Sequence, residues 1–565
     1  MTTCLRRSSG WAAGLALGLL LAPALSQAAD EAPAGESFKE SIEVSVVNLD
    51  VYVTDKKGQP VTGLRKEDFQ VFEDGSPVEI SNFFAESRGT APAAPAASGG
   101  PGQSAPERPV SQRLRLVVFV DDVNLSQANR MRILQNVGRF LHSELKPGDE
   151  VMLVRYDQKL DIRRQFTPDL EVVDAEIKEI LKLPTDIRKY QQSFSQAIQS
   201  VSFSQLGGER GGETGSGTEI EGQLNAWAGE ESVMVQGALD ALDSVVSWLA
   251  GVPGRKAVLY VSDGLPITPG LDLYTIYSRT PRASSAQERV SAMSAEKYDM
   301  TARFRQLTAH ASRNRVAFYP IEAFGTRDGS AVSLFDSVSL EVRQAGLRFL
   351  ADDTGGRALI NATDVPAALA RVSEDFGTYY SIGYQPRRPG DEAEHKIEVK
   401  VKARGAQVRY RQWYRDKPVS ETVAEATLAV MHFGPEDNPL EAKLEVVPGK
   451  KPGETLVRIK VPVAKLFLQP NGASRQGQLR LYVVASGEGS TTPVRQTKLV
   501  TVEVPEAEAA AGSRKEYTHE IAIPLKPGYY ALGVGVRDEL AAATSYLRRE
   551  LTVAAGAAGD TATRR

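Results

Sequence analysis

The sequence predicts a multidomain protein in which a central, doubly wound α/β domain is flanked by N-terminal and C-terminal β-sandwich domains. Residues 38–86 and 419–555 alternate apolar and polar side chains with a period of two, as half-buried strands do. Residues 113–375 instead alternate short apolar runs with segments of helical periodicity, which is typical of a parallel sheet covered by helices. At roughly 100–200 residues per domain, a chain of 565 residues is long enough for this arrangement.

The N-terminus has the pattern of a secretory signal peptide, residues 1–28. Arg6 and Arg7 precede an apolar run over residues 11–22, and small residues before position 29 favour cleavage after Ala28. The apolar run is shorter than the ~20 residues of a spanning helix, although an uncleaved membrane anchor is the alternative. We therefore expect an exported protein, periplasmic or extracellular, with no membrane span in the mature chain.

Composition excludes several classes of function. Cys4 is the only cysteine and lies in the predicted signal peptide, so the mature chain is expected to have no disulfide, thiolate metal site or cysteine nucleophile. Loss of Arg6 and Arg7 changes the formal net charge from −4 to −6, and no basic block follows. This balance argues against nucleic acid as a main partner.

The flanking segments are assigned from composition and periodicity. Residues 38–86 are expected to form a small β domain, and residues 87–112, dominated by Ala, Pro, Gly and Ser, a disordered linker. Residues 376–416 are expected to form a β extension of the central domain. Residues 419–555 then predict the C-terminal sandwich, and the small, polar residues 556–565 a disordered tail.

The central segment begins with an apolar run over residues 114–120, which predicts a strand buried on both faces. Residues 131–145 and 235–249 have helical periodicity, and residues 257–261 and 316–321 are further apolar strands. The polar insertions at 203–230 and 268–300 are expected beside the carboxyl edge of the sheet, where open α/β sheets bind ligands. Tolerated surface insertions are the alternative interpretation.

The first buried strand leads into a turn rich in oxygen donors. Asp122, Asn124 and Ser126 are spaced i, i+2, i+4 directly after that strand. Carboxylate, amide and hydroxyl oxygens are hard ligands of the kind that Mg²⁺ prefers. A later apolar strand ends at Val261 and is followed by Asp263-Gly264, which we expect near the same turn.

These residues resemble a von Willebrand factor type A (VWA) domain with its metal-ion-dependent adhesion site (MIDAS). The family's first motif, Asp-x-Ser-x-Ser, is matched by Asp122, Asn124 and Ser126, and its Asp-Gly pair by Asp263-Gly264. The layout from FEDGSPVEISNFF to YYSIGYQP is similar to the exported VWA-related proteins of acidobacteria, and the resemblance covers roughly residues 40–415.

The resemblance implies a non-enzymatic, adhesion-type protein that binds a protein ligand. In that family a divalent cation, Mg²⁺ or Mn²⁺, is held by the motif residues, and a carboxylate of the partner completes its coordination. This sequence departs from the family pattern in two places. Asn124 replaces a Ser, and the family's Thr has no clear counterpart, with Ser232 the nearest substitute by position.

Three alternatives stay open at this point. In the first, the site has lost its metal, and the chain is a metal-independent structural or interaction module of a secreted or periplasmic assembly. Asp122 instead caps the following helix and Asp263 accepts backbone hydrogen bonds in a turn. In the third, the chain is a hydrolase, but the absence of HExxH, GxSxG and P-loop motifs disfavours this. The five histidines, which could have formed such a motif, are scattered: His142, His310, His395, His432 and His519.

Overall fold

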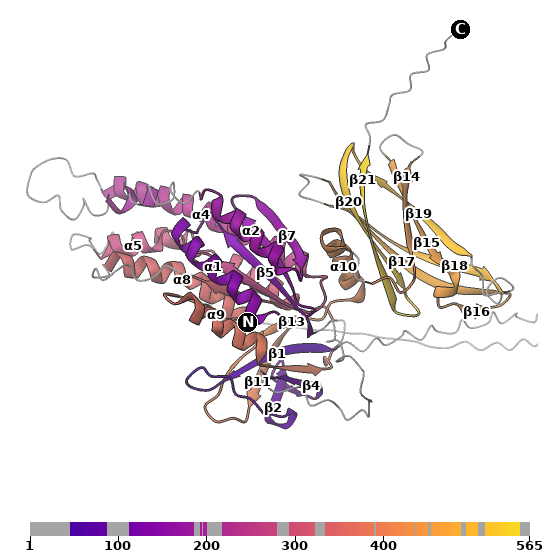
Figure 1. The fold of residues 1–565 in the computed structure, drawn as a ribbon, viewed down its shortest axis with the longest axis horizontal. Coiled ribbons are helices and arrows are strands. Elements are labelled where there is room, and N and C mark those ends of the chain that lie inside the picture. The colour runs from indigo at the N-terminus through magenta and orange to yellow at the C-terminus, as the bar shows by residue number, and fades with distance from the viewer. Residues whose placement is uncertain are drawn as a thin grey trace, which may run out of the picture. The chain divides into compact units, whose positions relative to one another are not determined.

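The fold is described from a computed structural model (Figure 1). It describes residues 46–87, 112–185, 193–194, 196–199, 217–279, 293–322, 334–388, 391–434, 437–449, 454–487, 493–506 and 515–553. All of these belong to one compact unit. The predicted signal peptide, nearly all of the predicted linker, the C-terminal tail and parts of both insertions lie outside the described residues.

Within these ranges the strands form five separate sheets, and four of the five are antiparallel. The expected fold class, a central doubly wound α/β domain between two β-sandwich domains, is therefore wrong for the molecule. Antiparallel sheets dominate, and the sheet in the middle of the chain is mixed. Periodicity within a segment indicates strands but does not say with which segment each strand pairs, and this is where the prediction failed.

The mixed sheet carries the candidate site. Its strand order is β7-β6-β5-β8-β9, with β5, β6, β8 and β9 parallel and β7 antiparallel to β6. Its strands are β5 (Leu114–Asp121), β6 (Glu150–Tyr156), β7 (Leu160–Thr167), β8 (Arg255–Val261) and β9 (Val316–Ile321). All eight residues of β5 are buried, because apolar clusters form on both of its faces.

Helices pack on both faces of this sheet, as Figure 1 allows the reader to follow. One cluster contains α1 (Gln127–Glu144), α2 (Leu170–Lys182) and α9 (Val365–Gly377). The other contains α4 (Gly217–Leu249), α7 (Thr301–Arg313) and α8 (Leu334–Thr354). The short helix α5 (Leu271–Ser278) packs on α4 in a smaller cluster. Helix α4 thus begins inside the first predicted insertion, well before residue 235.

Two small sheets each combine strands that precede the mixed sheet in the sequence with strands that follow it. Their orders are β12-β1-β10-β4 and β13-β11-β2-β3. The strands before the mixed sheet are β1 (Val47–Thr54), β2 (Phe69–Glu73), β3 (Ser76–Val78) and β4 (Ile80–Glu86), with a 3-10 turn η1 (Lys66–Asp68). Those after it are β10 (Tyr379–Tyr384), β11 (Glu394–Val401), β12 (Gln407–Arg409) and β13 (Trp413–Arg415). One apolar core unites both sets, so residues 46–86 do not pack as a sandwich of their own.

The C-terminal strands form two antiparallel sheets that share one apolar core. One sheet contains β14 (Lys443–Pro448), β15 (Glu454–Pro462) and β19 (Glu516–Pro524). The other contains β16 (Gln469–Asn471), β17 (Ser474–Gly487), β18 (Val494–Pro505), β20 (Gly528–Asp538) and β21 (Ala543–Val553). A 3-10 turn η3 (Val463–Lys465) follows β15. Residues 419–433, expected as the start of the sandwich, form the helix α10 (Val419–Phe433).

No helix in the described ranges has the length and apolar character needed to cross a membrane.

Candidate functional site

The predicted site residues lie where two parallel strands of the mixed sheet end. Val120 on β5 is paired with Val261 on β8, so the turns that follow them start side by side. The turn after β5 holds Asp122, Asn124 and Ser126, and the turn after β8 holds Asp263. The Asp263 N–H donates to the Asn124 carbonyl oxygen at 2.8 Å, which joins the two turns directly.

Asp122 is paired with two arginines. Its Oδ2 lies 2.8 Å from Arg130 Nη1 and 2.5 Å from Arg155 Nε. Asp122 and Arg130 are fully buried, and Arg155 is 12% exposed. Burial raises the pKa of Asp122, and the charges of Arg130 and Arg155 oppose that rise. Two fixed positive charges therefore sit against the carboxylate that was predicted to face a cation.

The same arginines hold the segment that follows α2. Arg130 Nη2 donates to the Leu183 carbonyl oxygen, and Arg155 Nη2 to that of Pro184 at 3.4 Å. Arg155 Nη2 also pairs with Asp157 at 2.7 Å. Asp122 and its two arginines thus connect α1, β6 and the chain after α2 around one buried carboxylate. This role is to hold the fold together.

Asn124 is turned toward the interior. Its Nδ2 donates to Asp121 Oδ2 at 2.9 Å. Two hydroxyls donate to the same oxygen, Tyr260 at 2.5 Å and Ser262 at 3.2 Å. Burial raises the pKa of Asp121, and these hydrogen bonds oppose the rise. The side-chain amide nitrogen of Asn124 is thereby committed to a neighbouring carboxylate.

Ser126 and Asp263 meet at the first turn of α1. Ser126 Oγ accepts from the Asn129 N–H at 3.4 Å and is the N-cap of the helix. Asp263 Oδ2 accepts from the Ser126 N–H at 2.9 Å, and its Oδ1 from Asn129 Nδ2 at 2.7 Å. Burial raises the pKa of Asp263, and the Ser126 bond opposes it. The alternative role of Asp263, accepting backbone hydrogen bonds in a turn, is thus supported, whereas the cap is Ser126 and not Asp122.

Ser232 lies on α4 and is half-buried. No hydrogen bond among the described residues links it to Asp122, Ser126 or Asp263. The structure therefore brings Asn124, Ser126 and Asp263 together and places Asp122 in the same turn, but it gives Ser232 no demonstrated part in the site.

The donor set in this arrangement fits a divalent cation poorly. Hydrogen bonds within the protein engage Asp122 Oδ2, both carboxylate oxygens of Asp263, Ser126 Oγ and the amide nitrogen of Asn124. The oxygens without a hydrogen-bond partner among the described residues are Asp122 Oδ1, which is buried, and Asn124 Oδ1. Two unpartnered oxygens fall short of the near-octahedral oxygen shell of Mg²⁺, and the two guanidinium groups beside Asp122 repel a cation.

Reasoning from the sequence missed the two arginines. Arg130 was detectable: it precedes Ile133 and Leu134 by three and four positions, so it lies on the apolar stripe of α1. A charged residue on such a stripe indicates a buried partner. Arg155 gave a weaker indication, because a single charged residue near the end of a strand can lie in solvent as easily as in a buried ion pair.

Comparisons with known proteins add little. No protein-family model and no curated protein matches the sequence. A solved structure of proximal thread matrix protein 1 from the mussel byssus is similar over 46% of this chain, at 13% identity and a TM-score of 0.19. The match spans about half (48%) of that protein's chain. A TM-score this low supports no conclusion about fold or function.

Proposed function

We propose that this chain is an exported, non-enzymatic protein-binding protein whose site after β5 works without a bridging metal. The observation that carries the proposal is the pairing of Asp122 with Arg130 and Arg155. In a metal-bridged site this carboxylate faces a cation. Here two guanidinium groups supply the compensating charge, so the turn is held in place by the protein itself.

The protein-binding class rests on the resemblance of residues 40–415 to VWA-related proteins. Two large apolar side chains in or next to the insertions support a partner surface there: Val233 on α4 is 73% exposed and Met293 is 71% exposed. Single exposed apolar residues are common, so they identify where to test and not what binds. The partner surface we propose contains these two residues.

The predicted Mg²⁺ or Mn²⁺ site is tested by isothermal titration calorimetry of the purified chain with each cation. An Asp122→Asn variant, which removes the charge and keeps the shape, is titrated beside it. We expect no saturable heat in either protein. One-site binding in the wild type that is absent in Asp122→Asn would contradict the metal-free site and restore the metal-dependent adhesion mechanism.

Partner binding is tested by affinity capture from the exported fraction of the source cells, in Mg²⁺ and in EDTA. The captured protein is then titrated against wild type, Val233→Ser and Met293→Ser. We expect an affinity that EDTA leaves unchanged and that the serine variants weaken. Turnover of a substrate panel that disappears in Asp263→Ala would instead support a hydrolase.

A further inference from the structure

Two adjoining cavities lie at the amino-terminal ends of the parallel strands of the mixed sheet, whereas Asp122 follows a carboxyl end. Strand β8 begins at Arg255 and Lys256 and leads to Asp263 at its other end. The cavities have volumes of about 290 and 560 Å³ and share four lining residues: Asn48, Lys256, Arg315 and Arg411. The larger volume falls within the roughly 300–1,000 Å³ of small-molecule pockets.

The three cationic residues shared by the cavities have no carboxylate partner among the described residues. Lys256 is 5% exposed, and its Nζ donates to the carbonyl oxygens of Leu249 at 3.1 Å and Ala250 at 3.4 Å. Among the described residues, the Arg411 guanidinium donates only to carbonyl oxygens, those of Ser312 and Asn48. For the guanidinium of Arg315 the described residues provide no hydrogen bond or ion pair.

Neighbouring carboxylates do not neutralise these cations. Asp50 is paired with Arg255 at 3.0 Å, and Glu425 with Lys417 at 2.6 Å. Asp416 and Asp437 also line the larger cavity. Of the six Lys or Arg side chains in its lining, three are paired with glutamates: Lys417 with Glu425, Arg313 with Glu394 and Arg415 with Glu421. The other three, Lys256, Arg315 and Arg411, outnumber the two lining aspartates.

The cations also disfavour one another's charge. Burial lowers the pKa of Lys256 well below its ordinary value, and the charges of Arg315 and Lys417 lower it further. Burial, followed by the charge of Arg315, lowers the pKa of Arg411 to about 10. A bound anion would relieve this repulsion.

The backbone of Arg315 is a separate observation. It has φ of 56° at the position after the C-cap of α7, in the left-handed region that glycine usually occupies in helix ends. A non-glycine residue there costs of order 1 kcal/mol. The chain thus holds a long cationic side chain at a position where its backbone is unfavourable and where it borders the cavity.

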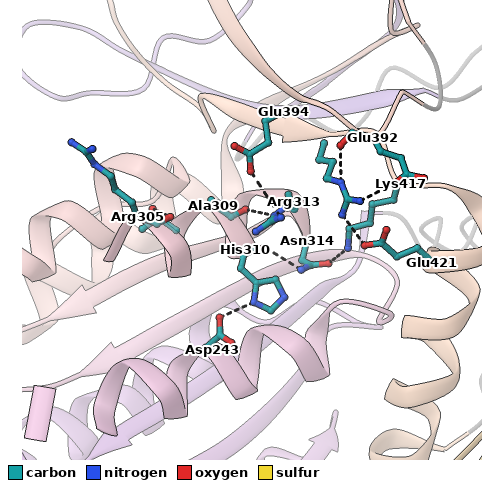
Figure 2. A network of polar contacts seen from close by, with 12 residues as sticks. Asp243, Arg305, Ala309, His310, Arg313, Asn314, Glu392, Glu394, Lys417 and Glu421 are labelled. Carbon is teal, nitrogen blue, oxygen red and sulfur yellow. Dashed lines mark hydrogen bonds and ion pairs between the residues drawn. The ribbon is translucent and has the colours of Figure 1, made fainter. Parts of the chain in front are cut away.

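The wall of the larger cavity is cross-linked by polar contacts, which Figure 2 shows. Lys417 Nζ donates to Asn314 Oδ1 at 2.6 Å, and Asn314 Nδ2 to the His310 carbonyl oxygen at 3.0 Å. Arg415, on β13, pairs with Glu421 on α10 at 3.0 Å. These contacts connect α7, β13 and α10, so a ligand would enter a site that is already formed, at low reorganisation cost.

We propose that Lys256, Arg315 and Arg411 form a binding site for a small multivalent oxyanion, such as a phosphate group or a dicarboxylate. Arginine donates paired N–H groups that match the oxygens of such anions, and lysine adds a point charge. The site is independent of the proposed protein-binding function, because it lies at the other end of β8 and involves none of the residues around Asp122.

The test is isothermal titration of the full chain with inorganic phosphate, sulfate and succinate, at constant ionic strength set with chloride. Two variants are titrated in parallel, Arg315→Gln and the control Arg305→Gln. Arg305 is an exposed arginine on α7, the helix that Arg315 follows, and its side chain points away from the network in Figure 2. We expect one-site binding of at least one anion, weakened about tenfold or more by Arg315→Gln and unchanged by Arg305→Gln.

A second variant, Arg315→Gly, separates binding from folding. Glycine accommodates a φ of 56° without strain, so this variant is expected to be at least as stable as the wild type while losing anion binding. Preference for phosphate and sulfate over succinate would identify the ligand group as phosphate-like, and the reverse as carboxylate. Absence of saturable binding for all three anions, or equal affinities in Arg315→Gln and Arg305→Gln, would overturn the proposal.

Discussion

At the scale of single residues, the most informative group is the carboxylate of Asp122. It is fully buried and its Oδ2 is shared by Arg130 and Arg155. A buried ion pair gains little over an apolar substitute, because each charge gives up its hydration. Breaking such a pair is costly, however, since the remaining charge stays buried without compensation. The cluster therefore fixes the turn after β5 in one conformation.

The first prediction follows from that asymmetry. Arg130→Met keeps the length and apolar stem of the side chain but removes the charge opposite Asp122. We expect the free energy of unfolding to fall by about 3 kcal/mol, the lower end for a broken buried pair, because Arg155 remains. Urea denaturation followed by circular dichroism measures this change.

The control for this prediction lies on the same helix. Arg139 is exposed, and within the part of the chain that the structure describes its side chain makes a single hydrogen bond, donated to the Gln135 carbonyl oxygen at 3.4 Å. Arg139→Met should change the unfolding free energy by no more than about 0.5 kcal/mol. Equal effects of the two substitutions would mean that the Asp122 pair contributes nothing specific.

At the scale of elements, the contact between the end of α4 and α10 is unusually close. A Cβ atom at Gly251 would lie 2.2 Å from the Cα of Ala426 on α10. The neighbouring Trp248 ring lies against His432 of α10, with ring centroids 5.2 Å apart. Burial lowers the pKa of His432 to about 4, which keeps this contact uncharged at neutral pH. The absence of a side chain at residue 251 is therefore what allows the two helices to approach.

The second prediction compares two glycines of this region. Gly251→Ala places a methyl group against the α10 backbone, and we expect it to destabilise the protein by about 1–3 kcal/mol through overpacking. Gly222→Ala, within α4, meets no described atom within 4 Å of the new methyl group apart from the adjacent backbone of its own helix, and it should stabilise by about 0.5–1 kcal/mol. Thermal unfolding of the two variants should therefore shift in opposite directions, and a common direction would contradict the close contact.

At the scale of the whole molecule, the small sheets connect distant parts of the chain. Val51 on β1 is paired with Tyr380 on β10, and Val71 on β2 with Val399 on β11. Both pairings join residues about 330 positions apart in the sequence. The strands before residue 87 therefore depend on those after residue 378 for their hydrogen bonds and their core.

The third prediction tests this dependence. A protease site inserted between residues 88 and 111, once cut, should leave the two fragments associated on a size-exclusion column under native conditions. They should separate in urea, because no covalent bond then joins them. Residues 46–86 expressed alone should lack the dispersed amide NMR spectrum of a folded domain. Separation of the cut fragments without denaturant would show that the N-terminal strands fold independently.

The sequence alone determined much of the local structure. The apolar run 114–120 forms β5, the stripe after it forms α1, and the residues of the predicted turn lie at the end of that strand. Ser126 begins α1 as an N-cap, a role that depends only on the helix that follows it. These features are local, because each depends on neighbours within a few residues.

The tertiary structure alone decided the pairing of the strands and the partners of the charged groups. Alternation in residues 46–86 and 379–415 is the same whether the segments form separate sandwiches or shared sheets. The pattern determines which side chains face the core, but not which strand pairs with which. Likewise, the sequence pattern of an aspartate after a strand is the same whether a metal cation or an arginine compensates its charge. Arg155 and the cations around Arg315 are brought to their places by long-range packing, which composition and periodicity do not encode, whereas the position of Arg130 on the apolar stripe of α1 was visible in the sequence.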